Sequence, residues 1–161
     1  MDYRDLAQDL LAQAKGQGAD DADTLIAEGT EFSVSVRKGE IETLKESGSK
    51  ALGLRVFVGR RTANAHTSDF SAPALREFAA SVVEMARATG EDRAAGLPDD
   101  VVPAEEIDLG LYDASTMAVP TDKRIEQART AEATALAVPG ITNSHGGSYR
   151  SGEGFVLLAN T

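Results

Sequence analysis

The stretch Val36–Asp69, VRKGEIETLKESGSKALGLRVFVGRRTANAHTSD, decides the fold. In its second half the aliphatic residues Leu52, Leu54, Val56 and Val58 alternate with Gly53, Arg55 and Phe57. A period of two is typical of a β-strand with one buried face. Gly39 and Gly59 tolerate positive φ, so each predicts a tight reversal of the chain. The stretch therefore predicts successive strands joined by short turns, which must pair antiparallel.

The alternation continues upstream, where Phe32, Val34 and Val36 are separated by polar residues. A further break is expected at Gly48 and Ser49. From about Asp23 to Ser68, the sequence predicts an antiparallel meander of four or five strands.

Three segments show the 3.6-residue apolar period of amphipathic helices: about Tyr3–Lys15, residues 71–89, and a segment from Thr121 to just before Pro139. Ser71 is expected to cap the second helix, and Pro73 fits its first turn. We expect the first two helices to cover one face of the sheet. The predicted fold class is α+β: a two-layer sandwich in which helices cover an antiparallel meander sheet.

The remaining segments predict how the chain is divided. Residues 91–120 hold prolines, glycines and many acidic residues without a sustained period, which predicts an exposed connector. Loop flexibility is the simplest interpretation of the glycine-rich stretch Gly146–Gly154. The apolar run Phe155–Ala159 that follows it predicts a strand near the end of the chain. We therefore expect an α+β domain over residues 1–140 and the start of a following, truncated β region over 141–161. The alternative is that this strand inserts beside an earlier one.

Charge is spread unevenly along the chain. The net charge is −10, but residues 30–61 carry seven basic and four acidic side chains, a local balance of +3 against −13 elsewhere. Binding to a phosphate backbone is therefore not expected. The basic segment is either the solvated face of a sheet or a surface for an anionic partner or a peptide carboxylate. Under the second interpretation, Arg55, Arg60 and Arg61 are the candidate substrate- or partner-binding residues.

The side chains needed for catalysis are scarce. There is no cysteine, and the two histidines, His66 and His145, are 79 residues apart and outside any His-Glu-x-x-His pattern. Ser144 beside His145 does not establish the spatial arrangement of a catalytic triad. We predict no catalytic residue and no metal site in this chain.

No apolar run approaches the roughly 20 residues needed to span a bilayer, and the first residues do not resemble a signal peptide. We therefore expect a cytoplasmic protein with no membrane partner.

Two parts of the sequence closely resemble the TldD/PmbA family. The first runs from Glu31 to Ser71 and continues through the predicted helix ALREFAASVVEMARAT into EDRAAGLPD; the second is NSHGGSYRSGEGFVLLANT at residues 143–161. The blocks KGEIETLKES and GLRVFVGRRTA are more similar to the PmbA branch, also called TldE, than to the TldD branch. Members of the family are about three times this length, so the resemblance is to their N-terminal domain.

The resemblance implies a role in a peptidase of two kinds of subunit. The TldD subunit carries a zinc-binding His-Glu-x-x-x-His helix, and the PmbA-type subunit lacks that motif and pairs with it. This chain would then be a non-catalytic structural and substrate-chamber part of a zinc metallopeptidase assembly. Its cofactor, zinc, would lie in the partner subunit, and its partners would be a TldD-type subunit or a second copy, and peptide substrates. The alternative is a regulatory module that modulates DNA gyrase through protein contacts, as the family's older name implies.

Overall fold

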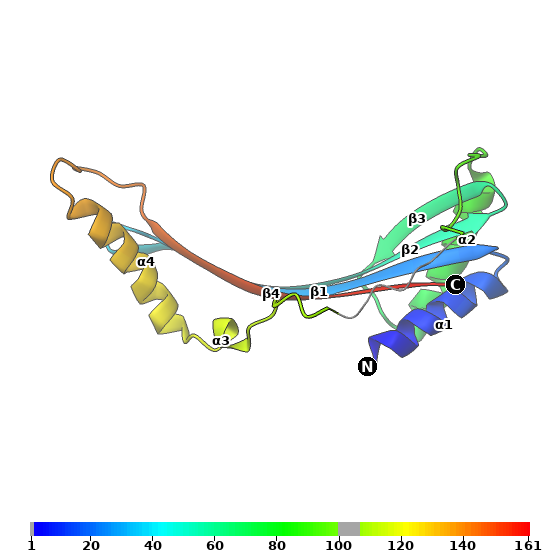
Figure 1. The fold of residues 1–161 in the computed structure, drawn as a ribbon, viewed down its shortest axis with the longest axis horizontal. Helices are drawn as coiled ribbons and strands as arrows, with labels where there is room; N and C mark the ends of the chain where they lie inside the picture. The colour runs from blue at the N-terminus through cyan, green and yellow to red at the C-terminus, as the bar shows by residue number, and fades with distance from the viewer. Residues whose placement is uncertain (1, 100–106) are drawn as a thin grey trace. The chain divides into compact units, whose positions relative to one another are not determined.

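The structure is a computed structural model that describes residues 2–99 and 107–161. Part of the predicted connector, residues 100–106, lies outside the described residues. The elements in chain order are α1 (Tyr3–Gly16), β1 (Asp21–Arg37), β2 (Glu40–Val58), β3 (Arg61–Thr67), α2 (Ala72–Ala88), α3 (Ala114–Met117), α4 (Thr121–Leu136) and β4 (Gly147–Asn160) (Figure 1). Helices at the predicted positions and an antiparallel sheet confirm the α+β fold class.

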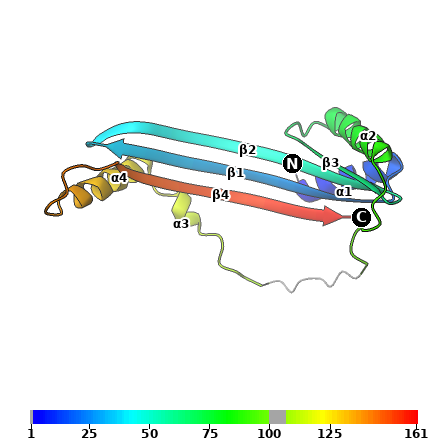
Figure 2. The same cartoon turned by 90° about the horizontal axis from the view of Figure 1, so that it is seen from above.

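The sheet has the strand order β3-β2-β1-β4 (Figure 2). The chain turns from β1 into β2 at Lys38 and Gly39, which both have positive φ. It turns again at Gly59, and β2 pairs with β3 from Val58↔Arg61 to Leu52↔Thr67. These turns confirm an antiparallel meander, but it has three strands over this range and not the four or five predicted. The expected break at Gly48 and Ser49 is wrong, because β2 continues through both residues. Glycine fits an extended backbone as well as a turn, so its presence did not require a reversal.

Strand β4 lies beside β1 in the same sheet. The amide of Thr161 donates to the carbonyl of Ala22 at 3.0 Å, and near its other end β4 places Gly152 against the carbonyl of Thr30. The two strands therefore run antiparallel. Of the two arrangements considered for the C-terminal strand, insertion beside an earlier strand is the one observed. The division of the chain at residue 140 stays a prediction.

The chain forms two compact units. Unit 1 comprises Met1–Glu28, Lys50–Glu105 and Phe155–Thr161, and unit 2 comprises Gly29–Ser49 and Glu106–Gly154. Strands β1, β2 and β4 each contribute one end to each unit. We describe the units separately.

In unit 1, α1 and α2 pack against one face of the sheet (Figure 1). The buried core consists of apolar side chains from both helices and from β1 and β2, among them Leu10, Leu11, Ile26, Leu52, Leu54, Val56, Leu75, Val82 and Val83. This arrangement is the predicted helix layer on a sheet. Asp2 caps α1 by accepting a hydrogen bond from the amide of Arg4 at 2.8 Å.

Ser71 occupies the predicted N-cap position of α2, but its side chain makes no capping hydrogen bond. The carboxylate of Asp69 accepts a hydrogen bond from the amide of Ser71 at 2.9 Å, so Asp69, and not the Ser71 hydroxyl, holds the turn before the helix. This local bond lowers the pKa of Asp69. Ser71 therefore lies at the N-cap as predicted, but the predicted capping by its side chain is wrong.

In unit 2, α4 packs on the end of β1. Phe32, Val34 and Val36 form a small core with Ala128. The carboxylate of Glu132, which is only 3% exposed, accepts hydrogen bonds from the amides of Lys38 at 2.9 Å and Gly39 at 3.0 Å. These bonds, first from Gly39 and then from Lys38, lower the pKa of Glu132. A helix side chain thus holds the β1–β2 turn.

Gly147, the first residue of β4, and Gly146 before it fit tightly against their neighbours. A Cβ on Gly147 would lie 2.1 Å from the carbonyl oxygen of Ala128, and one on Gly146 would lie 2.3 Å from the carbonyl oxygen of Val36. Gly146 also has φ of +107°, which disfavours other residues. The interpretation of these glycines as a source of loop flexibility is wrong. They allow the backbone of β4 to approach α4 and β1 closely.

Candidate functional site

The three candidate arginines lie in unit 1, and each is engaged within the chain. The guanidinium of Arg55 pairs with the carboxylate of Asp23, with Nε at 2.9 Å from Oδ2, and lies over the ring of Phe57 at 5.2 Å. Phe57 is buried, whereas the side chain of Arg55 remains half-exposed. Arg55 therefore covers an aromatic side chain and still presents part of its guanidinium to solvent.

Arg60 and Arg61 contact the last turn of α2 and the segment that follows it. Nη1 of Arg60 donates to the carbonyls of Arg93 at 3.3 Å and Ala95 at 3.2 Å. Arg61 donates to the carbonyl of Arg87 at 3.0 Å and pairs with Glu91 at 3.5 Å. A pocket of about 420 Å³ lies beside this segment, and of the three arginines Arg55 lines it. Their role in binding a substrate or partner stays a prediction.

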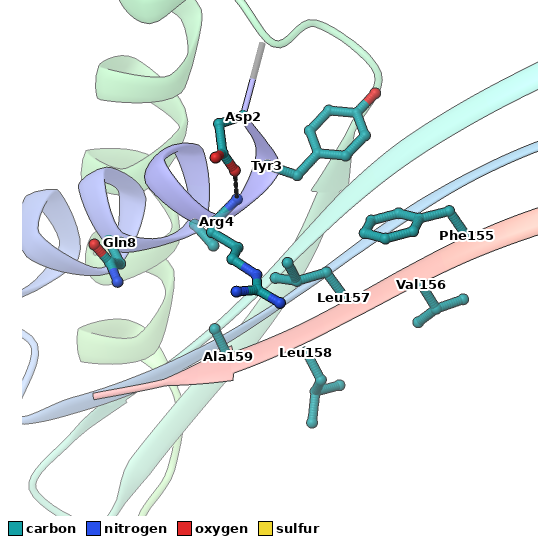
Figure 3. Close-up of a pocket in the computed structure, with 10 residues that line it drawn as sticks. Asp2, Tyr3, Arg4, Gln8, Phe155, Val156, Leu157, Leu158 and Ala159 are labelled. Atoms are coloured by element: carbon teal, nitrogen blue, oxygen red, sulfur yellow. Dashed lines mark hydrogen bonds between the residues drawn. The ribbon is translucent and has the colours of Figure 1, made fainter. Parts of the chain in front are cut away.

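A larger groove, of about 910 Å³, lies in unit 1 between the first turns of α1 and the last residues of β4 (Figure 3). Its walls are residues 2–4, 7 and 8 on α1 and Phe155–Ala159 on β4. The rings of Tyr3 and Phe155 contact each other with centroids 5.7 Å apart. Leu157 and Ala159 point toward α1, and Val156 and Leu158 point away from it (Figure 3). One wall is therefore a β-strand with aliphatic side chains on both faces.

The polar side chains of the groove come from the start of α1 and include the carboxylate of Asp2, the hydroxyl of Tyr3 and the guanidinium of Arg4. The side chain of Arg4 extends from α1 toward β4, beside Leu157 (Figure 3). At the other end, the hydroxyl of Tyr3 donates to the carboxylate of Glu28 at 2.5 Å. This hydrogen bond is the main cause that raises the pKa of Tyr3, with partial burial and the negative charge of Glu28 adding to it. The Tyr3 hydroxyl is thus held as a neutral donor, and Arg4 supplies the positive charge.

The wall of the groove formed by β4 includes one edge of the sheet. Among the strands of residues 2–99 and 107–161, β4 lies at one edge of the sheet, and edge strands present backbone N–H and C=O groups that can pair with another strand. Our reading of the sequence missed this site. The available signal was the uncharged run Phe155–Ala159, which we interpreted as a strand, either of a truncated region or inserted beside an earlier strand, and not as part of a binding site.

The donor set does not fit a resident metal. His66 and His145 are both exposed, and within residues 2–99 and 107–161 no three His, Cys, Asp or Glu side chains are grouped to hold an ion. A catalytic zinc site needs about three protein ligands converging on one point. We therefore assign no zinc-dependent step to these residues. In the same ranges, no helix combines the length and apolar character needed to cross a membrane.

The fold and groove define a class: an α+β domain whose open antiparallel sheet ends in an uncharged edge strand. Comparison with known proteins identifies the family. Residues 22–86 match the first domain of PmbA/TldA metallopeptidases. The chain is 34% identical to the metalloprotease PmbA of Escherichia coli O157:H7 over 153 residues, which cover 94% of this chain and 33% of that protein.

Two solved structures share the fold. A protein from Bacteroides thetaiotaomicron, named as a candidate modulator of DNA gyrase, superposes with a TM-score of 0.86 at 25% identity over 98% of this chain and 36% of its own. TldE from Thermococcus kodakarensis gives a TM-score of 0.81 at 14% identity over 97% of this chain and 35% of its own. The chain belongs to the TldD/PmbA family, as the resemblance predicted, and spans about a third of the length of the curated relatives that it matches.

Proposed function

We propose that this chain is a non-catalytic domain of a TldD/PmbA-type zinc metallopeptidase assembly, where it forms structural framework and part of a substrate chamber. One observation carries the proposal. The chain matches the first domain of proteins named as metalloproteases, while its described residues bring no three metal-binding side chains together. Hydrolysis of peptides would then depend on zinc held by a TldD-type partner subunit.

We propose that the partner is a TldD-type subunit or a second copy of this chain, and that the assembly acts on peptides in the cytoplasm. The contact for an acidic partner or a peptide carboxylate would be Arg55, Arg60 and Arg61. The side chains of Arg55 and Arg61 are 49% and 42% exposed despite their internal bonds, so each guanidinium retains accessible donors. The net charge of −10 disfavours direct binding to nucleic acid.

Peptide cleavage in the presence of zinc tests the proposal. We expect no cleavage by the chain alone, cleavage by the mixture with a TldD-type subunit, and loss of that activity on chelation. The triple variant R55A/R60A/R61A should weaken association with that subunit. R76A is the matched control, because Arg76 is also exposed and lies on α2. Zinc-dependent cleavage by the chain alone would refute the non-catalytic assignment.

The alternative of a gyrase-modulating module rests on the names of fold relatives, and no feature of the described residues favours it. Capture of gyrase subunits by the purified chain tests this alternative separately.

A further inference from the structure

The pocket beside Arg55, of about 420 Å³, has walls from two strands and one loop of unit 1. Arg55 and Phe57 on β2 line it together with their register partners on β3, Asn64 and Thr62. The opposite wall is formed by the loop 92–96. Every residue of these walls lies between positions 55 and 96, well inside the chain. The volume falls within the range of roughly 300–1,000 Å³ that is typical of small-molecule sites.

The loop wall is held in place by Arg60, at the turn between β2 and β3. The carbonyl of Arg60 accepts a hydrogen bond from the amide of Asp92 at 2.7 Å, and its guanidinium donates to the carbonyls of Arg93 and Ala95. Oδ1 of Asp92 accepts from the amide of Ala94 at 2.9 Å. Its other oxygen, Oδ2, accepts no hydrogen bond from residues 2–99 and 107–161. A fixed carboxylate with a free acceptor therefore lines this wall.

Arg55 supplies the opposite charge on the strand wall. Asp23 accepts hydrogen bonds from Nε and Nη2 of Arg55, while Nη1 donates to no group in the part of the chain that the structure describes. A guanidinium has five N–H donors, so Arg55 can bind another acceptor without leaving Asp23. The ion pair also fixes the guanidinium, which lowers the entropy lost when a ligand binds. The pocket thus has a cationic donor on one wall and an anionic acceptor on the other.

We propose that this pocket binds a zwitterion of the amino-acid or dipeptide type, with its carboxylate at Arg55 and its ammonium group at Asp92. One charge of each sign matches a ligand that carries both. A simple anion would meet the carboxylate of Asp92, and a simple cation would meet the guanidinium of Arg55. The amide side chain of Asn64 can donate to and accept from a peptide group between the two charges.

The ligand class rests only on the charges of the pocket. Amino acids and dipeptides are also products of peptide hydrolysis, so a role of the pocket in binding product rests on the proposed function. The two ideas can fail separately, because binding is measured on this chain without zinc and without a partner subunit.

A ligand series on the unmodified 161-residue chain tests the proposal, with alanyl-alanine as the probe and amide chemical shifts as the readout. We expect a dissociation constant of roughly 0.1–10 mM, because two charge-assisted bonds to partly exposed groups hold the ligand. The shifts should centre on Arg55, Asn64 and Asp92. N-acetyl-alanyl-alanine lacks the ammonium group and alanyl-alanine amide lacks the carboxylate, so each should bind at least about tenfold more weakly.

Two variants assign the charges. R55Q and D92N should each weaken binding of alanyl-alanine at least about tenfold. R55Q should no longer distinguish alanyl-alanine from its amide, and D92N should no longer distinguish it from its N-acetyl form. R76Q and E77Q are the matched controls, because both side chains are exposed on α2 and do not line the pocket. Far-UV circular dichroism of all four variants checks that the fold is kept.

The possible results separate clearly. Absence of shifts up to about 50 mM alanyl-alanine would overturn the proposal. Equal binding of the three ligands would overturn it too, since neither charge would then be recognised. Weakening by R55Q with D92N unchanged would indicate a plain carboxylate site and not a zwitterion site. Equal weakening by R76Q or E77Q would place the ligand outside this pocket.

Discussion

Substitution of Gly147 by alanine tests how closely β4 approaches α4. The added Cβ would lie 2.1 Å from the carbonyl oxygen of Ala128 and 2.9 Å from the amide nitrogen of Glu132, and Cβ contacts under 3.0 Å are essentially never found. Both neighbours are backbone atoms, so no side-chain rotation relieves the overlap. The first strand residue or the helix must shift by roughly 1 Å.

The expected cost is at the upper end of the range for overpacked sites, about 3 kcal/mol. With a urea dependence of about 1.5–2 kcal/mol per molar for a chain of this size, the unfolding midpoint of unit 2 should fall by roughly 1.5–2 M. Hydrogen exchange of the α4 amides, followed in urea, reports that unit specifically. Gly48→Ala is the matched control, because nothing lies within 4 Å of its added Cβ. A change below about 0.5 kcal/mol for Gly147→Ala would refute the close approach.

Three further predictions concern caps and buried polar groups. The pKa of Glu132 in the folded protein is lowered from its ordinary value of 4.5, so the ionised carboxylate stabilises the fold above pH 4.5. This stability is lost as the pH falls through the folded-state pKa. E132Q should therefore flatten the pH dependence of stability, as measured by urea titrations between about pH 3 and 7. R124M removes a buried guanidinium that donates to two carbonyls and lies 4.8 Å from the centre of the Phe32 ring. The free energy of unfolding of unit 2 should therefore fall by about 1–3 kcal/mol. An unchanged urea unfolding midpoint would contradict this role. S71A should leave thermal stability almost unchanged, whereas D2A should cost about 1 kcal/mol, and a reversed order would show that the capping roles are misassigned.

The local pattern of the sequence was sufficient to predict most of the fold. Alternating apolar residues and the glycines at the two turns predicted β1 to β3, and the 3.6-residue period predicted α1, α2 and α4. These features depend on neighbours along the chain, which the sequence displays directly. The length of β2 was missed because Gly48 is compatible with both a turn and a strand.

The long-range features could not be predicted. Strand β4 pairs with β1, more than a hundred residues earlier, and alternation along a strand does not identify its neighbour in the sheet. The hydrogen bonds that Glu132 accepts from the amides of Lys38 and Gly39 depend on tertiary packing, which the local sequence pattern does not display. The groove beside Phe155 has the same origin, because α1 and β4 lie at opposite ends of the sequence.

The contact of Glu132 with the β1–β2 turn has a consequence for which substitutions the turn tolerates. The carboxylate of Glu132 binds main-chain amides, so the side chain at position 38 matters only through its backbone preference. Lys38 has a positive φ of 54°, a conformation that asparagine and glycine adopt readily, so either residue should replace it without loss. Position 132 should tolerate far fewer substitutions. Aspartate is one methylene shorter and would not reach both amides from the same helix, so sequence variation should be permitted at the tip of the hairpin and restricted on the helix that holds it.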